Sequence, residues 1–200
     1  MGMVEKLQSR NYASRRVHEL ARLAAALLPA DARVLDVGCG DGFVDKLIME
    51  RRPDVQIEGC DVVAWEGAHI PVSMYDGDRL PYDDNAFDAV MLIDVIHHAE
   101  DMDRLMQDVV RVAAHHIVIK DHLADRRFSV PILKWMDDVG NRRHGVNLPY
   151  CYLTTPQWQE LLSRHGIESE EWITNMRLYP LWAEPFLGKG LHFFLKGKIT

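Results

Sequence analysis

A strand, a glycine-rich loop and a helix are predicted to follow one another in residues 33–51. Residues 33–37 form a short apolar run with one polar interruption, which is typical of a buried parallel strand. Glycine then occupies every second position, at Gly38, Gly40 and Gly42. Such a loop turns sharply and lets a ligand approach without a Cβ atom in the way, and the helix behind it offers free N–H groups. The segment predicts an α/β fold with a ligand at this loop.

The spacing of the glycines separates two ligand classes. The dinucleotide pattern G-x-G-x-x-G requires a glycine at position 43, where this chain has Phe43. The chain instead has Asp36 two residues before Gly38. This arrangement resembles motif I of the class I (Rossmann-like) methyltransferases that use S-adenosylmethionine (SAM), and type 11-like members in particular. In that family the acidic residue ends the first strand and the glycines border the methionine and ribose of SAM. A tight turn without a ligand is the alternative.

Two further acidic residues match that family. Residues 55–61 read as the second strand, and Asp61 lies 21 residues beyond Gly40, the interval at which a carboxylate reaches ribose hydroxyls. A strand-end turn is the alternative for Asp61. After a weaker third strand at 70–76, the segment 76–88 resembles the family form D-x-x-x-L-P-[FY]-x-x-x-x-F-D, which implies that Asp78 binds the adenine amino group. The cofactor-binding residues implied by the resemblance are Asp36, Gly38, Cys39, Gly40, Gly42, Asp61, Val62, Asp78, Arg79, Leu80 and Asp94.

Histidines follow two predicted buried strands, residues 89–93 and 115–122. Since the carboxyl ends of parallel strands meet at one edge of a sheet, His97, His98 and His122 are expected near the transferable methyl group. A histidine is suited to act as a base near neutral pH, and His97 is the first candidate. We expect one of the paired histidines to cap the helix at 102–112 and the other to face the acceptor.

A metal site is a minor alternative for these strand ends. His97, Asp121 and His122 are ligand types, but they have no tight local spacing, and we therefore expect no metal.

Residues 123–154 read as an insertion over the active site. A short helix is expected at 130–139, and the turn-rich remainder shows no apolar periodicity. Long irregular segments of compact domains are often lids, whereas a solvated surface loop is the alternative. By position alone, the candidates for binding the methyl acceptor are Asp121, Asp138, Asn141, His144, Tyr150 and Tyr152.

The rest of the chain completes one domain over residues 1–200. An N-terminal helical segment, residues 1–30, is expected to pack on one face of the sheet. The final strands are expected at 168–174 and 191–197. The resemblance implies a three-layer αβα sandwich with a seven-stranded, mostly parallel sheet in the order 3-2-1-4-5-7-6 and an antiparallel last strand.

Composition restricts the partners of the chain. Its net charge is −7 and its basic pairs are scattered, which disfavours a nucleic-acid substrate. No run approaches the roughly 18 apolar residues of a membrane span, and no signal peptide is recognised. Cys39, Cys60 and Cys151 lack C-x-x-C spacing, which argues against disulfides and indicates a reducing cytoplasm.

The resemblance therefore predicts a cytoplasmic enzyme that transfers a methyl group from SAM to an oxygen, nitrogen or carbon atom of a small molecule, with S-adenosylhomocysteine as product. Because SAM is already activated, the protein has mainly to position the reactants. An RNA or protein methyltransferase, and a catalytically silent SAM-binding module that acts through a partner, are the alternatives.

Overall fold

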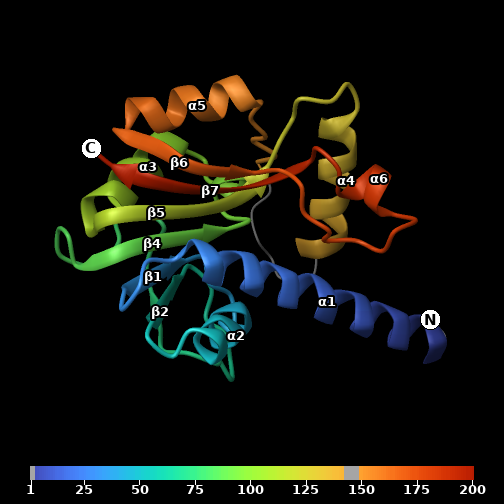
Figure 1. The fold of residues 1–200 in the computed structure, drawn as a ribbon, viewed down its shortest axis with the longest axis horizontal. Helices are drawn as coiled ribbons and strands as arrows, with labels where there is room; N and C mark the ends of the chain where they lie inside the picture. The colour runs from blue at the N-terminus through green and yellow to red at the C-terminus, as the bar shows by residue number, and fades with distance from the viewer. Residues whose placement is uncertain (1–2, 142–148) are drawn as a thin grey trace.

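A seven-stranded sheet runs through the protein in the order β3-β2-β1-β4-β5-β7-β6 (Figure 1). The computed structural model describes residues 3–141 and 149–200, with side chains for 15–139 and 149–200. The strands are β1 Arg33–Val37, β2 Gln56–Asp61, β3 Val72–Met74, β4 Phe87–Ile93, β5 Ala113–His122, β6 Ile167–Ile173 and β7 His192–Ile199. Strand β7 is antiparallel to β5 and β6, and the other pairs are parallel. The fold class, strand order and antiparallel last strand expected from the resemblance are confirmed.

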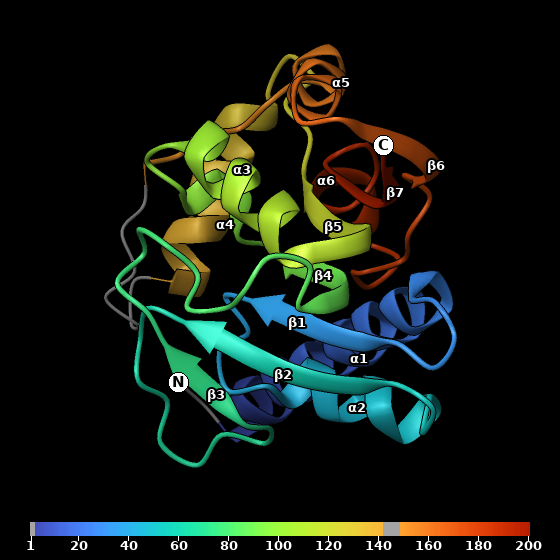
Figure 2. The ribbon, with the colours of Figure 1, turned by 90° about the vertical axis from the view of Figure 1, so that its left-hand side faces the viewer.

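Helices cover both faces of this sheet (Figure 2). They are α1 Met3–Leu27, α2 Phe43–Arg51, α3 Met102–Val112, α4 Ser129–Asn141, α5 Thr155–Arg164 and α6 Glu184–Leu187, and a 3-10 turn η1 spans Ile96–His98. Helices α4 and α6 lie together beyond the end of the sheet to which β4 points (Figure 1). Among the described helices, none is both long enough and apolar enough to cross a membrane.

Two apolar layers separate the sheet from its helices. Helices α1 and α2 pack on one face, where Val34 lies, and α3 and α5 pack on the other face with Leu35. Neighbouring residues of a strand point to opposite faces, so the apolar run of β1 serves both layers. Each fully buried aliphatic side chain contributes about 1.5–3 kcal/mol relative to exposure. With both faces covered, the carboxyl edge of the sheet is left for a ligand.

The structure corrects several expected details. Strand β3 is only three residues long, because polar, exposed residues follow it at the sheet edge. Neither paired histidine caps α3: the carboxylate of Asp101 accepts the amide of Arg104 at 2.9 Å, and a short acidic side chain is well suited to that role. The segment 176–190, between β6 and β7, contains the short helix α6. Strand β5 begins two residues earlier than expected, at Ala113.

Two buried carboxyl groups lie beneath the glycine loop. Asp36 on β1 is 3% exposed and Asp45 in the first turn of α2 is fully buried. Burial, and then the repulsion from Asp45, raise the pKa of Asp36 well above its usual range. Burial raises the pKa of Asp45 to about 7. The pair therefore retains a proton at mildly acidic pH, which avoids two adjacent buried charges.

The substitution Asp45→Asn is expected to flatten the dependence of stability on pH. Because the pKa of Asp45 is about 7 in the folded protein and near 3.8 when exposed, the folded state holds a proton that the unfolded state releases. The free energy of unfolding therefore falls as pH rises from about 4 to about 7, by at most about 4 kcal/mol. Denaturant unfolding across this range measures the slope. The exposed Asp83→Asn variant is the control, and an unchanged slope in Asp45→Asn contradicts the assignment.

The substitution Gly59→Ala is expected to destabilise the contact between β2 and the glycine loop. A Cβ atom at Gly59 would overlap the side chain of Cys39 in that loop. Overpacking of this kind costs about 1–3 kcal/mol. If the overlap is the cause, Cys39→Ala should recover part of the loss in the double variant, measured by denaturant unfolding. Additive costs would show that the two side chains do not interact.

Candidate functional site

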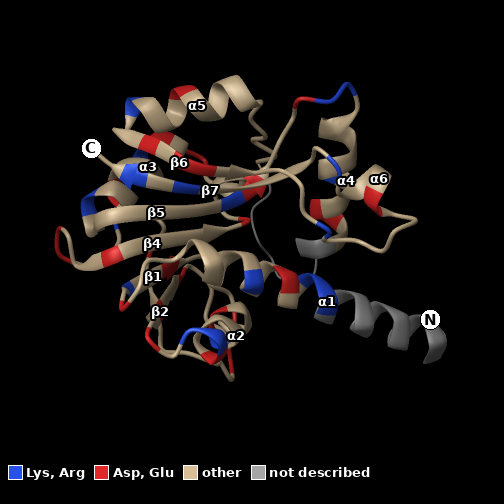
Figure 3. Ribbon diagram, in the orientation of Figure 1, with Lys and Arg blue, Asp and Glu red and all other residues tan. Residues whose placement is uncertain are grey.

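A cleft of about 1160 Å³ lies at the carboxyl edge of the sheet. The segments that follow β1, β2 and β4 form one side of it, and α1, α4 and residues 179–187 form the other. Acidic and basic segments lie side by side where β4 and β5 end (Figure 3). A pocket for one drug-sized molecule has a volume of about 300–1,000 Å³. The cleft is therefore large enough for a cofactor together with a second small molecule.

Asp61 fixes the glycine loop on one side of the cleft. One carboxylate oxygen accepts the amide of Gly40 at 2.8 Å, and the other accepts the amide of Val63 at 2.9 Å. Gly40 has a φ of +59°, a conformation that favours glycine, and a Cβ atom added there would come no nearer than 3.9 Å to another residue, at Trp65. The backbone at Gly40 is thus exposed to the cleft and available to a ligand.

The cofactor-binding residues expected from the sequence fall into two groups. Gly38, Gly40, Asp61, Val62 and Asp94 line the cleft. The residues that do not line it are Asp36, Cys39, Gly42, Asp78, Arg79 and Leu80.

The predicted cofactor residues that do not line the cleft lie in different environments. Asp36 is buried beneath the loop and Leu80 belongs to the core. Asp78 is on the surface, in an ion pair with Arg104. Trp65 also lines the cleft and was not predicted, although it lies only four residues beyond the end of β2.

Asp94 is paired with two cations at the end of β4. Its carboxylate accepts from the ammonium group of the fully buried Lys120 and from the guanidinium of Arg16, the latter at 2.6 Å. Burial alone would raise the pKa of Asp94, but Lys120 and Arg16 hold it well below its usual range. The carboxylate is therefore charged. Neither ion pair of Asp94 was predicted from the sequence, since Arg16 comes from α1 and Lys120 from β5.

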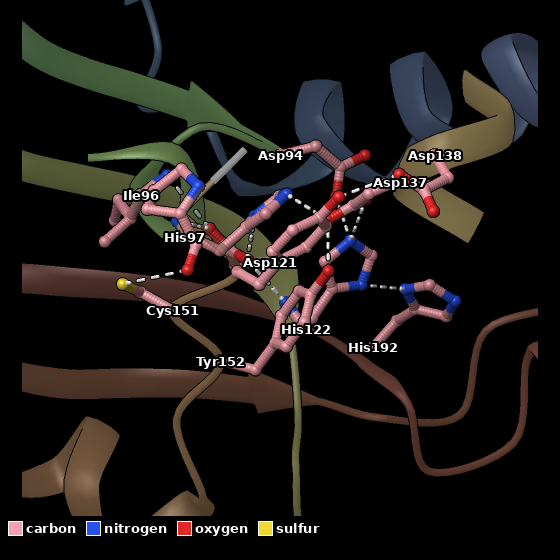
Figure 4. A network of polar contacts seen from close by, with 12 residues as sticks. Asp94, Ile96, His97, Asp121, His122, Asp137, Asp138, Cys151, Tyr152 and His192 are labelled. Atoms are coloured by element: carbon pink, nitrogen blue, oxygen red, sulfur yellow. Dashed lines mark hydrogen bonds and ion pairs between the residues drawn. The ribbon is translucent and has the colours of Figure 1, made fainter. Parts of the chain in front are cut away.

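A second carboxylate, Asp121, orients His97 (Figure 4). The Nδ1 atom of His97 lies 2.7 Å from Asp121 Oδ1, and Asp121 also accepts the amides of Ile96 and His122. The Nε2 atom of His97 lies 3.4 Å from Asp137 Oδ2. Burial lowers the pKa of His97, but Asp121 and Asp137 outweigh it and raise the pKa to about 10. His97 is therefore held as a cation between two carboxylates.

The hydrogen bonds of His192 determine the tautomer of His122. His192 Nε2 lies 2.8 Å from the carbonyl oxygen of Leu187, so this nitrogen carries the proton. His192 Nδ1 then accepts from His122 Nδ1, 3.0 Å away. The remaining nitrogen of His122, Nε2, is then unprotonated, and it lies 3.6 Å from Asp94 Oδ1 and 3.8 Å from Asp137 Oδ1. Burial lowers the pKa of both rings well below the usual value, which keeps them neutral.

The residues predicted to bind the acceptor lie at different distances from the cleft or outside the described residues. Tyr152 donates to Asp137, and Tyr150 donates to Asp138 at 2.7 Å. Asp137, which the sequence reasoning missed, lines the cleft, whereas its neighbour Asp138 does not. Asp121 is buried behind His97. His144 and the side chain of Asn141 lie outside the described residues.

The outer part of the cleft is apolar. Trp135 and Met136 from α4, with Trp182 and Leu187 from the segment that includes α6, face it. His98 also lines the cleft, and burial lowers its pKa. Apolar walls with a few polar groups at one end are typical of sites for small organic molecules.

Comparison with known proteins identifies the family of this fold. The chain matches the family described as "Methyltransferase domain" over residues 5–171. It is 35% identical to ajmaline N-methyltransferase of Rauvolfia serpentina over 151 residues, which cover 68% of this chain and 52% of that protein. It is 28% identical to norajmaline N-methyltransferase of the same plant over 191 residues, which cover 84% and 65%. The chain thus spans about half to two thirds of the length of these relatives.

A solved structure supports the same fold. Burkholderia thailandensis 1,6-didemethyltoxoflavin-N1-methyltransferase, which contains bound 1,6-didemethyltoxoflavin and S-adenosylhomocysteine, aligns with a TM-score of 0.67. The two are 15% identical, and the alignment covers 92% of this chain and 78% of the other. With the family match over most of its length, the chain belongs to the class I SAM-dependent methyltransferase domains.

Proposed function

We propose that this protein transfers the methyl group of SAM to a nitrogen or oxygen atom of a small organic molecule, releasing S-adenosylhomocysteine. The observation that carries the proposal is the fixed Asp61–Gly40 contact at one end of a cleft large enough for two ligands. The 35% identity to ajmaline N-methyltransferase favours a nitrogen atom in an alkaloid-like acceptor. A carbon acceptor is the less favoured form of the same proposal.

The half of the cleft around the glycine loop suits SAM. Gly38 and Gly40 present backbone without a Cβ atom, and Asp61 has carboxylate lone pairs for the ribose hydroxyls beside the amides that it already accepts. Val62 offers an apolar contact for the base, and Asp94 is charged and also lines the cleft. Asp78, Arg79 and Leu80 do not line the cleft. We therefore propose that they contact the adenine only if their segment rearranges when SAM binds.

Bound SAM supplies an electrophilic methyl group, so the protein has mainly to position the acceptor. His97, His98 and His122, the catalytic candidates from the sequence, all line the cleft. Of these, His122 has an unprotonated ring nitrogen, and we propose that it accepts a hydrogen bond from the acceptor. His97 holds its proton between two carboxylates, so we propose a structural role for it.

We further propose that residues 123–154 form a lid over the acceptor and that residues 1–200 form one domain. Helix α4 within this segment supports the lid, because Trp135 and Met136 line the cleft. A cytoplasmic location is supported by three free cysteine thiols. The scattered basic segments in Figure 3 give little support to RNA as acceptor.

The proposal is tested by calorimetric titration with SAM, S-adenosylhomocysteine and NADH. We expect micromolar binding of the two adenosyl compounds and none of NADH. Formation of S-adenosylhomocysteine with a panel of small amines and phenols then distinguishes an enzyme from a silent binding module. Failure of both adenosyl compounds to bind would refute the proposal.

The variant Asp61→Asn is expected to weaken SAM binding at least tenfold. The amide side chain cannot offer two charged acceptor oxygens, and bonds to a charged acceptor are roughly twice as strong as neutral ones. Glu66→Gln removes an exposed acid five residues away and should leave the affinity unchanged. Equal affinities for the two variants would exclude Asp61 from the cofactor site.

A further inference from the structure

Three side chains with metal-binding groups meet at the cleft. His97 and His98 belong to the turn η1 after β4, and Asp137 belongs to α4. One nitrogen or oxygen atom from each lies within 4.8 Å of the other two, and all three residues line the cleft. We propose that His97, His98 and Asp137 bind a divalent first-row transition-metal ion, a site that goes beyond the methyl transfer proposed above.

The surroundings of His97 match those of a metal-binding histidine. Its Nδ1 atom is engaged with Asp121 at 2.7 Å, which leaves Nε2 as the ligand atom. Nε2 is buried, makes no hydrogen bond among the described residues, and lies 3.4 Å from Asp137 Oδ2. Histidine ligands of metals usually donate their other ring N–H to a carboxylate, which fixes the ring. Asp121 already provides that contact, and backbone amides fix Asp121 in turn.

Asp137 and His98, the other two proposed ligands, are also oriented or left available for a metal ion. The hydroxyl of Tyr152 donates to Asp137 and orients its carboxylate. The Nδ1 atom of His98 is buried and has no hydrogen-bond partner among the described residues. With metal–ligand distances of about 2.0–2.2 Å, neighbouring ligand atoms are about 3–3.5 Å apart. The separation of His97 from Asp137 already fits, and the trio as a whole needs side-chain shifts on the order of 1 Å.

The ligand set selects the kind of ion. Two imidazoles and one carboxylate suit Zn²⁺, Fe²⁺, Co²⁺ or Mn²⁺ and leave coordination positions open toward the cleft. Mg²⁺ and Ca²⁺ prefer oxygen ligands and fit poorly. A second trio, His97 with Asp121 and His122, is the weaker candidate, because His97 and Asp121 would have to break the hydrogen bond between them.

A metal ion would take the place of the proton on His97. Arg16 and Lys120 pair with Asp94, whereas Asp121 and Asp137 lie against His97. With His97 protonated, three cations therefore face three carboxylates in the described part of the cluster. Metal binding at Nε2 releases that proton, because only the neutral imidazole is a ligand, and the metal ion then supplies the positive charge that Asp137 faces.

The test is Zn²⁺ binding by the full-length protein after removal of metals with a chelator. We expect one Zn²⁺ per chain in a competition titration with a chromophoric chelator, and a visible absorption spectrum when Co²⁺ is used in its place. Asp137→Asn should lower Zn²⁺ affinity at least 100-fold and His98→Gln at least tenfold. Asp138→Asn, a neighbouring carboxylate that also pairs with a tyrosine, is the matched control and should keep the wild-type affinity.

The outcomes separate this site from the proposed methyl transfer. Absence of stoichiometric Zn²⁺ binding in protein shown to be folded by circular dichroism would overturn the metal site. Equal Zn²⁺ affinity in Asp137→Asn and Asp138→Asn would do the same. SAM titrations on the stripped samples are independent: SAM binding without Zn²⁺ binding refutes only the metal site, and Zn²⁺ binding without SAM binding refutes only the proposed function.

Discussion

The carboxylate of Asp94 joins the core of this protein to its cleft. Lys120 is fully buried in β5, so its ammonium group requires a partner, and Asp94 at the end of β4 provides it. The same carboxylate binds Arg16 of α1, and the amide of Asp94 donates to the carbonyl of Lys120 at 2.8 Å. Removing one partner from a buried pair typically costs about 3–5 kcal/mol, because the other charge is left uncompensated. One carboxylate at the cleft therefore links α1 with the ends of β4 and β5.

Other polar side chains gather at the same edge for a geometric reason. Both faces of the sheet are covered by apolar layers, so a charged side chain within a central strand can find partners only where the strands end. Asp121 and His122 follow this rule at the end of β5, and His192 meets them from the antiparallel β7. The reversal of β7 brings the start of that strand, rather than its end, to the cleft. His192, which begins β7, is thus hydrogen-bonded to His122, which ends β5.

The sequence predicted the sheet better than it predicted the site. Glycine spacing and apolar runs are local signals that indicated the strands and the loop, and the family resemblance implied the strand order, which is confirmed. The choice between Asp137 and Asp138 depends instead on the rotation of α4, since neighbouring residues of a helix point about 100° apart. The sequence reasoning chose Asp138, but Asp137 faces the cleft. The ion pairs of Asp94 with Arg16 and Lys120 were not predicted for a similar reason, because nothing local shows that two cations distant in the chain share one carboxylate.

The glycine loop and α4, which line the cleft together, differ in how strongly their sequences are restricted by the rest of the fold. The glycine loop is restricted by Asp61, by the overlap that a Cβ atom at Gly38 would make with Val95, and by the strands on either side. Helix α4, in contrast, packs beyond the sheet and supplies both the apolar wall, through Trp135, and the carboxylate of Asp137. Under the proposed function, changes in α4 would alter acceptor binding without disturbing the sheet. A protein that keeps the loop but changes α4 would then keep SAM and accept a different small molecule.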